Sequence, residues 1–265
     1  MRTSIKNNFS PVAGILVFAL CFLVSINVKA ADRYYYQIKV YHLKNTNQVD
    51  RVERYLKDAY VPALHKLGIK NIGVFKPITE TDTTDRKIYV FIPFKTMDEL
   101  EATPAKLLQD KQYLENGKDY LEVSQAANAV YTRIETILLR AFPTAPTVTP
   151  STLTSNKTDR FYELRSYESA SEKDHASKLK MFESETDIFK KVNSNGVFYA
   201  QVIAGARMPN LMYMTTYNDK KDRDDHWTAF FATPEWKTLS GMAEYKGNVS
   251  KNEQIFLHPT SYSDL

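Results

Sequence analysis

Two short segments of the chain alternate between apolar and polar positions in the same way, 126 residues apart. Residues 35–41 and 161–167 each hold an aromatic pair, a polar residue, an aliphatic residue, a cation and a closing tyrosine. Alternation with a period of two is typical of a β-strand, so each segment is predicted to be a strand with two faces. In the later copy Tyr162 lies on one face, and Glu163 and Arg165 lie on the other. A segment that recurs at about the length of a small domain predicts a fold built from two copies of one unit.

Outside these segments, the hydrophobic pattern predicts the same order of elements in each half. Runs of apolar and aromatic residues are typical of strands, and apolar positions at steps of three and four are typical of helices. In the first half we expect strands over residues 34–43, 69–75, 87–94 and 131–142, with helical regions over 45–68 and 96–117. In the second half we expect strands over residues 161–167, 197–204, 211–217 and 255–262, with helices after the first and third. The order β-α-β-β-α-β in each half predicts an α+β fold of two ferredoxin-like units in tandem.

Proline, glycine and capping residues set the expected ends of the helices. Pro62 lacks an amide N–H and is expected to kink or restart the first helix, which Gly68 should end. Thr96 followed by Glu99 is typical of a capping box at a helix start. In the second half, the Asn-Gly pair at 195–196 is expected to close the first helix.

Residues 141–158 are the clearest domain boundary in the sequence. This segment is rich in proline and threonine and has few large apolar residues, so we expect an extended linker. The chain then divides into a signal peptide over residues 1–30, a first ferredoxin-like domain over 31–140 and a second over 159–265. At about 3.1 Å per residue, an extended linker of this length allows the two halves to pair within one chain.

The first thirty residues have the pattern of a signal peptide. Arg2 and Lys6 precede an apolar run over residues 11–26, and residues 28–30 form a small-x-small cleavage site. The apolar run is shorter than the roughly 20 residues that span a bilayer, and an uncleaved anchor is the alternative. We therefore expect an exported protein, periplasmic or secreted. The only cysteine, Cys21, lies in this segment, so the mature protein would form no disulfide.

Composition indicates a folded protein and argues against some classes of partner. Hydrophobic residues make up 43% of the sequence and aromatic residues 12%, which is enough for a packed core. The net charge is +4, and the first thirty residues contribute three cations and no Asp or Glu. The rest of the chain is close to neutral, which gives no basic footprint for nucleic acid or an anionic membrane surface.

The sequence contains none of the common catalytic and nucleotide-binding motifs. There is no GxSxG, GxGxxG, Walker A, HExxH or CxxC pattern. The five histidines have no spacing typical of metal ligands, so we expect no metal site and no bound cofactor. Whether the protein is an enzyme is therefore left open by the motifs.

His226, in an acidic segment before Trp227, is the candidate catalytic residue. It could act as a general base or as a haem ligand, with Trp227 lining a pocket. The alternative is that the acidic residues favour the first turn of a helix, with Trp227 in the core and His226 half exposed. Aligning the repeated Ala-Thr-Pro sequences at 102–104 and 232–234 pairs Thr96 with His226, so that the histidine belongs to the second half alone.

Residues 162–167, together with Trp227, Phe230 and residues 234–237, resemble the NIPSNAP family of the dimeric α/β-barrel superfamily. Residues 60–69 also look like the end of the family's first helix. The resemblance covers nearly all of the mature chain, better in the second half, and its motifs are packing signatures rather than catalytic ones. It implies that two ferredoxin-like units set their sheets against each other and close a barrel.

A physical argument supports the same expectation. The sheet face without helices would carry apolar residues such as Tyr36, Phe91 and Met212, and their burial against a second sheet favours closure. The sequence leaves open whether the sheets pair within one chain, as a monomer with a pseudo-dimeric barrel, or between chains in a homo-oligomer.

If the face that carries Glu163 and Arg165 lines the barrel, these side chains could orient a polar ligand. The alternative is an exposed pair or a structural ion pair, worth about 0–1 kcal/mol at a surface. Gln37 and Lys39 occupy the same positions in the first half. The residues predicted to contact a ligand are Tyr162, Glu163, Arg165, His226 and Trp227.

These observations favour an exported barrel protein that binds a small, mainly apolar ligand or a protein partner. A cofactor-independent monooxygenase that uses the barrel interior is the second hypothesis, because that activity occurs in the superfamily that the chain resembles. A haem protein is the third.

Overall fold

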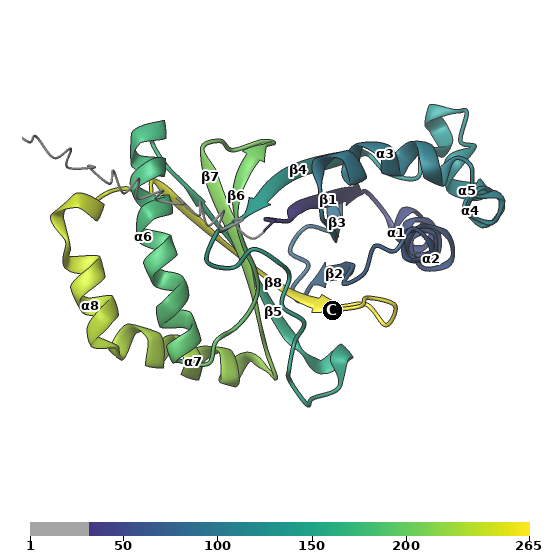
Figure 1. Ribbon diagram of the computed structural model, residues 1–265. Helices are drawn as coiled ribbons and strands as arrows, with labels where there is room; N and C mark the ends of the chain where they lie inside the picture. Colours follow the sequence, from purple (N-terminus) through teal and green to yellow (C-terminus); the bar gives the residue numbers. More distant parts are fainter. Residues whose placement is uncertain (1–31) are drawn as a thin grey trace, which may run out of the picture. The chain divides into compact units, whose positions relative to one another are not determined.

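Eight antiparallel strands close into a barrel in the computed structural model, which describes residues 32–265 (Figure 1). The signal peptide expected over residues 1–30 lies outside the described residues. Among residues 32–265, no helix is both long and apolar enough to cross a membrane. The strands are β1 (Tyr35–Leu43), β2 (Gly73–Pro77), β3 (Arg86–Phe94), β4 (Arg133–Ala141), β5 (Phe161–Glu168), β6 (Asn195–Ala204), β7 (Asn210–Tyr217) and β8 (Lys251–Pro259).

The order of strands around the barrel is β1-β3-β2-β8-β5-β7-β6-β4. Each half therefore supplies four adjacent strands, in the orders β4-β1-β3-β2 and β8-β5-β7-β6. The halves join at two seams, where β2 pairs with β8 and β4 pairs with β6. The predicted α+β fold of two ferredoxin-like units closed into a barrel is confirmed, and hydrogen-bonded edge strands make the closure.

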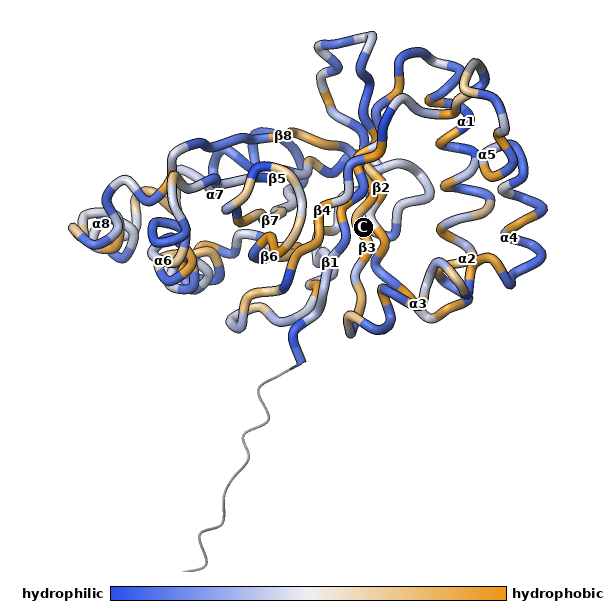
Figure 2. Tube along the Cα trace, turned by 90° about the horizontal axis from the view of Figure 1, so that it is seen from above, coloured by the Kyte–Doolittle hydropathy of each residue, from blue (hydrophilic) through white to orange (hydrophobic). Residues whose placement is uncertain are grey.

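Helices cover the outer face of each set of strands. The helices of the first half are α1 (Thr46–Tyr55), the π-helix η1 (Leu56–Tyr60), α2 (Val61–Lys66), α3 (Met97–Leu107), α4 (Lys111–Asn116) and α5 (Lys118–Leu121). Those of the second half are α6 (Glu172–Lys191), α7 (Lys220–Ala232) and α8 (Pro234–Gly241). Apolar and polar residues alternate along α1 and α2 as amphipathic helices require (Figure 2).

The irregular first helix follows from Pro62, the second residue of α2, which has no amide N–H to donate. The expected interruption takes the form of the π-helix η1 just before it, rather than a break in the chain. The carbonyl of Asp58, one turn earlier, instead accepts a hydrogen bond of 2.8 Å from the side chain of Asn116. Gly68 follows the helix at a positive φ of 84°, as expected for a residue that ends a helix.

Helices α3 and α7, which follow the third strand of the first and second half, start with equivalent capping boxes. The Thr96 hydroxyl accepts from the amide of Glu99 at 3.1 Å, and the Asp219 carboxylate accepts from the amide of Asp222 at 2.8 Å. The alignment that paired Thr96 with His226 is therefore wrong, since His226 lies in the second turn of α7. The repeated tripeptide misled because its proline lies inside α3 in one copy and begins α8 in the other.

The expected closing of α6 by the Asn-Gly pair at 195–196 is also wrong. The helix ends at Lys191, and Asn193 takes the left-handed conformation with φ of 52°. Asn tolerates this conformation better than most residues, so the turn is complete two residues early. The Asn-Gly pair then begins β6.

One end of the barrel interior is filled by aromatic side chains. The rings of Tyr36, Phe91 and Phe198 lie within 5.4 Å of one another, measured between centroids. Tyr162 packs against Phe75 at 4.8 Å on the same level. Such contacts exclude water, so the barrel is closed here and is not a pore.

Residues 142–160, which we call the strap, lie across this closed end. The side chain of Val148 is buried in the barrel core, and the amide of Thr149 donates to the carbonyl of Val197 at 3.0 Å. The arginines of the two Asp-Arg pairs bond at and within this region: Arg33 donates to the carbonyl of Ala141, just before the strap, and Arg160 donates to that of Leu153 within it. The segment predicted as a linker is therefore packed on the barrel at Val148 and Thr149.

We expect Val148→Asp to lower the free energy of unfolding by about 3 kcal/mol or more, because it buries an unpaired carboxylate in the barrel core. Thr147→Asp is the matched control, since Thr147 is exposed and adjacent on the strap. Urea unfolding followed by tryptophan fluorescence measures both. Equal effects of the two substitutions would show that the strap is not part of the core.

Candidate functional site

The other end of the barrel is open, and a cavity of about 500 Å³ lies there. Along β1 the inward positions run from Tyr36 in the aromatic layer to Ile38, Val40 and finally His42 at the opening. We call this cavity the barrel mouth. Its lining side chains belong to Ile38, Val40, His42, Pro77, Thr79, Thr81, Asp85, Lys87, Tyr89, Arg133, Glu135, Ile137, Leu164, Ala206, Arg207, Met212, Glu253 and Ile255.

The lining of the mouth divides into an apolar floor and a charged rim. The floor consists of aliphatic and methionine side chains, namely Ile38, Val40, Ile137, Leu164, Met212 and Ile255. The rim carries three cations, Lys87, Arg133 and Arg207, and three carboxylates, Asp85, Glu135 and Glu253, with His42 beside them. A cavity of this volume, with an apolar floor and a few placed polar groups, has the features of a small-molecule site.

His42 is the centre of the larger group of charges at the rim. It is buried, its Nδ1 lies 2.7 Å from Asp85 Oδ1, and its Nε2 lies 3.3 Å from Glu135 Oε1. Arg133 pairs with the same Glu135 oxygen at 2.7 Å, and Lys87 pairs with Asp85 at 3.1 Å. Burial acts to raise the pKa of Asp85, but the hydrogen bonds from His42 and Lys87 outweigh it and lower that pKa below its usual value.

Arg207 and Glu253 form a separate ion pair at the rim. Arg207 lies in the loop between β6 and β7 with a positive φ of 64°, which is uncommon for a residue other than glycine. Desolvation opposes its charge, but the hydrogen bond with Glu253 raises the pKa of Arg207 above its ordinary value. The guanidinium is therefore charged at any pH at which the protein folds.

Tyr89, on β3, is a buried polar residue of the mouth whose hydroxyl has no partner. Its side chain is 7% exposed, and its hydroxyl makes no hydrogen bond within residues 32–265. Burial, helped by the charge of Glu253, raises the pKa of Tyr89, so the hydroxyl stays protonated. It can donate a hydrogen bond to an acceptor oxygen in the cavity.

The residues predicted from the sequence lie elsewhere. Tyr162 is fully buried at the closed end, in contact with Phe75. Glu163 and Arg165 share a face, as predicted, but that face lies against α7 and does not line the barrel. The alternation along β5 shows which residues share a face, and the helices on its outer side decide which of the faces is internal to the barrel.

Glu163 is the centre of a fully paired polar cluster between β5 and α7. Its Oε1 accepts from Arg165 at 2.7 Å and from Arg223 at 2.6 Å, while its Oε2 accepts from Arg223 at 2.9 Å and from Trp227 at 2.8 Å. The Arg165 guanidinium also lies 3.9 Å from the Trp227 ring centroid. Burial acts to raise the pKa of Glu163, but Arg223 and Arg165 outweigh it and lower that pKa. These contacts attach α7 to the sheet and leave no group of the carboxylate free for a ligand.

His226 does not join this cluster. Its Nδ1 lies 2.8 Å from the carbonyl oxygen of Asp222, one turn earlier on α7, and its ring packs 5.5 Å from that of Tyr217. The side chain is 22% exposed on the outer layer. The structure therefore brings Glu163, Arg165 and Trp227 together and leaves His226 apart from them and from the barrel mouth.

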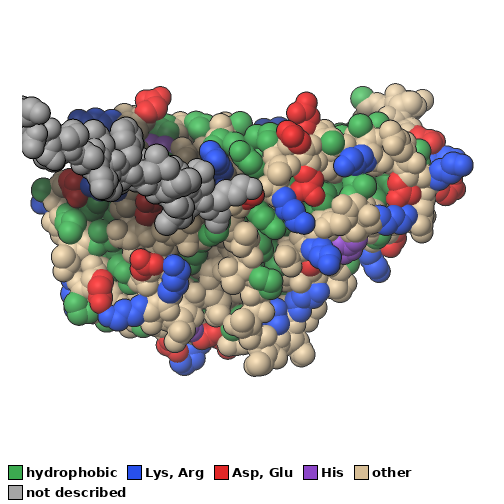
Figure 3. All heavy atoms as spheres, in the orientation of Figure 1, with side chains coloured by type: hydrophobic (Ala, Val, Ile, Leu, Met, Phe, Trp, Pro, Cys, Tyr) green, Lys and Arg blue, Asp and Glu red, His purple; other side chains and the backbone are tan. Residues whose placement is uncertain are grey.

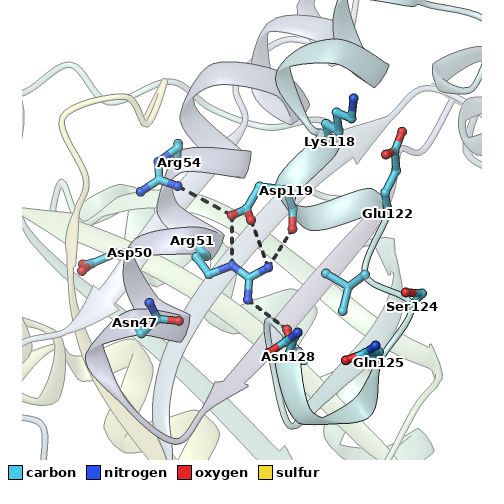
Figure 4. Close-up of a pocket in the computed structure, with 11 residues that line it drawn as sticks. Asn47, Asp50, Arg51, Arg54, Lys118, Asp119, Glu122, Ser124, Gln125 and Asn128 are labelled. Atoms are coloured by element: carbon cyan, nitrogen blue, oxygen red, sulfur yellow. Dashed lines mark hydrogen bonds and ion pairs between the residues drawn. The ribbon is translucent and has the colours of Figure 1, made fainter.

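A second hollow, of about 720 Å³, lies over α1 and α5 (Figure 4). Its central side chain, Arg51, donates from Nε to Asp119 at 2.9 Å, from Nη1 to the Asn128 carbonyl at 2.9 Å and from Nη2 to the Asp119 carbonyl at 2.8 Å. All three nitrogens are thus committed to holding α5 and the following turn. This hollow has no apolar floor, so we place the candidate site at the barrel mouth.

The sequence analysis missed the mouth residues. His42, Glu135, Arg207 and Glu253 come from three strands and one loop that are far apart in the sequence. One signal was present, since His42 shares the alternating face of Tyr36 and is the first polar residue at the end of that apolar series. Read alone, each of the others is an ordinary charged residue near a strand end.

Comparison with known proteins finds a family model that matches the second half. Residues 162–264, from β5 to Asp264, match the NIPSNAP family model. This range contains the second-half motifs of the resemblance, and residues 60–69 lie outside it. No curated protein matches the sequence.

Solved structures share the fold. Two whose descriptions read "putative monooxygenase" come from Lactobacillus acidophilus and Fusobacterium nucleatum, at 13% and 8% identity and TM-scores of 0.56 and 0.51. The alignments cover 86% of this chain in both cases, and 94% and 93% of the other chains. A NIPSNAP family protein from Agrobacterium tumefaciens aligns with 43% of this chain and 98% of its own, at 18% identity and a TM-score of 0.37. At these identities, the first two show a shared fold over most of the chain.

We expect Glu163→Gln to lower the free energy of unfolding by about 3–5 kcal/mol, because it leaves the buried guanidinium of Arg165 without its carboxylate and removes one of the two carboxylates that pair with Arg223. Glu235→Gln removes an exposed partner of Lys191 and should change stability little. Urea unfolding at pH 7 measures the difference, and similar effects of the two substitutions would contradict a structural role for the cluster.

The difference in unfolding free energy between wild type and Glu163→Gln should also depend on pH. Because the folded pKa of Glu163 lies below its ordinary value of 4.5, its stabilising contribution is present above that pH and is lost as pH falls through the folded pKa. The stability gap between wild type and Glu163→Gln should therefore be constant near neutral pH and shrink in acid.

Proposed function

We propose that this chain, whose residues 162–264 form a NIPSNAP domain, is an exported protein that binds a small, mainly apolar molecule in the barrel mouth. The observation that carries the proposal is the cavity itself: about 500 Å³ with an aliphatic floor and one unpartnered hydroxyl, that of Tyr89. Export rests on the signal-peptide pattern of the first thirty residues.

The shape of the site supports a small molecule rather than a protein partner. The floor is concave and formed by side chains from the inner face of the barrel, which a flat protein surface cannot reach. On the face drawn in Figure 3, cationic and anionic side chains are interspersed, without a large patch of one sign. That face therefore does not favour a protein partner with a strong net charge of either sign.

The size of the floor sets the expected affinity. A ligand of about 13 heavy atoms, at about 0.3–0.5 kcal/mol per atom, gains about 4–6 kcal/mol on binding. This range corresponds to dissociation constants from about 1 mM to about 50 μM. An acceptor oxygen that reaches Tyr89 would move a ligand toward the tighter end, since the hydroxyl otherwise remains unpaired.

Ile255→Trp should fill the mouth and weaken binding of an apolar probe such as 2-naphthol by about tenfold or more, because Ile255 lines the floor and is only partly buried. Ile203→Trp is the matched control, since Ile203 is 37% exposed near the end of β6 and is not part of the mouth lining. Isothermal titration calorimetry measures both. Equal loss in the two variants, or no binding by the wild type, would contradict the proposal.

A cofactor-independent monooxygenase is the second candidate, and the contact between Asp85 and His42 favours it. A carboxylate at Nδ1 orients an imidazole for proton transfer at Nε2, as in other paired bases. In such a reaction the base removes a proton from an electron-rich phenol or quinol, and O₂ accepts electrons from the resulting anion. The two proteins that share the fold over most of the chain are described as putative monooxygenases.

For this second function, His42→Gln should lower kcat/KM for quinol oxidation at least about 100-fold, the usual contribution of a general base. His226→Gln should leave the rate unchanged, because His226 lies outside the mouth. Oxygen consumption with a panel of quinols and anthrones measures the rates. Wild-type rates at the level of the buffer alone would rule out the activity for those substrates.

A further inference from the structure

We infer that the ligand of the barrel mouth is a small carboxylic acid with an apolar body, and that Arg207 is the residue that selects it. This inference rests on the proposed function of the mouth and adds the chemical class of the ligand. It is carried by the spare donors of Arg207, by the position of Tyr89 and by the conformation of the loop that holds Arg207.

Arg207 has donors to spare inside the mouth. Only its Nη1 is used, on Glu253, while Nε and Nη2 donate to no group within residues 32–265. Its side chain is 31% exposed and lines the cavity. A guanidinium with two free N–H edges matches the two oxygens of a carboxylate better than any other common group.

The other two cations of the rim are less suited to this role. Lys87 pairs with Asp85 at 3.1 Å, and its ammonium is a point charge without the planar fork that binds both oxygens of a carboxylate. Arg133 pairs with Glu135 at 2.7 Å, and its side chain is 62% exposed. Among the cations that line the mouth, Arg207 therefore combines a planar guanidinium with partial burial.

Tyr89 adds a second donor to the same site. Its hydroxyl is unpartnered in the cavity, and its nearest charges include those of Arg207 and Glu253. A carboxylate in the mouth can thus accept from the guanidinium and from the phenol together, while its apolar body rests on the aliphatic floor. The guanidinium cannot accept a hydrogen bond and carries a positive charge, which disfavours an ammonium group beside Arg207.

The backbone of the loop is strained in a way that places this side chain. Arg207 adopts a left-handed conformation, with φ of 64°, which is unfavourable for a residue other than glycine. Gly205, two residues earlier, has φ of 144°, a conformation that glycine adopts readily. The loop thus keeps an unfavourable backbone conformation at the residue whose side chain lines the mouth.

Glu253 is the expected competitor of the ligand. Its carboxylate occupies one edge of Arg207, and its side chain is 38% exposed, so it can turn toward solvent when an acid binds. Removing its charge should strengthen acid binding, which is the opposite of the effect expected for Arg207. Substitution of Arg207 and substitution of Glu253, which contact each other, should therefore change the affinity for the acid in opposite directions.

The test compares 2-naphthoic acid with 2-naphthamide, which have the same shape and differ in charge, by isothermal titration calorimetry at pH 7.5. Wild type should bind the acid about tenfold or more tightly than the amide, since hydrogen bonds to charged groups exceed neutral ones by about that factor. Arg207→Gln should weaken the acid by a similar factor and leave the amide within about threefold. Glu253→Gln should tighten binding of the acid.

Arg133→Gln is the matched control, because it removes the same charge from the same rim without touching Arg207. Thermal unfolding of each variant verifies that it is folded. Equal affinity of the acid and the amide in wild type, or equal effects of Arg133→Gln and Arg207→Gln, would overturn the inference while leaving the mouth a binding site. If neither compound binds, the proposed function falls as well.

Discussion

The structure depends on the pairing of strand edges between the two halves. Each four-stranded unit has two edge strands with unpaired backbone groups and one sheet face without helices. Pairing β2 with β8 and β4 with β6 removes the open edges and buries both faces at once. The interior is shared as a result: one cluster of core residues contains Tyr36 and Phe91 from the first half and Tyr162 and Phe198 from the second. Neither unit has this part of its core without the other.

Closure by itself gives a filled barrel, and the asymmetry of the ends gives a site. The inward positions of β1 change from aromatic at Tyr36 to aliphatic at Ile38 and Val40 and then to polar at His42. At the aromatic end the strap adds Val148 to the core and leaves no opening. At the other end aliphatic side chains and the ring of Tyr89 meet charged side chains, and a cavity remains. The cavity is therefore a consequence of side-chain size and order along strands of fixed spacing.

The sequence predicted the fold well because its two strongest signals are local. The alternation of residues 161–167 and its echo at 35–41 identified the central strand of each unit, and the capping box at Thr96 and Glu99 marked a helix start. Which face of β5 points inward could not be predicted, since nearly every residue of that strand is buried, on one side by the barrel and on the other by helices. Glu163 was a candidate on the condition that its face lined the barrel, but that face packs against α7, where Arg223, 60 residues away, pairs with the carboxylate. The mouth was missed for a related reason: its charges meet only after closure.

The two halves share an order of helices and strands, but residues at equivalent positions have different roles. Glu163 and Arg165 attach α7 to β5, whereas in the first half Lys39 lies 5.2 Å from the ring of Tyr60 and makes no comparable cluster. The mouth likewise takes its histidine-carboxylate group, His42 with Asp85 and Glu135, from the first half and its arginine-glutamate pair from the second. A symmetric pair of identical units would present the same groups twice, facing each other across the opening. Joining two different units in one chain allows a proton acceptor on one side of the cavity and a carboxylate-binding arginine on the other, which is the arrangement that an asymmetric ligand requires.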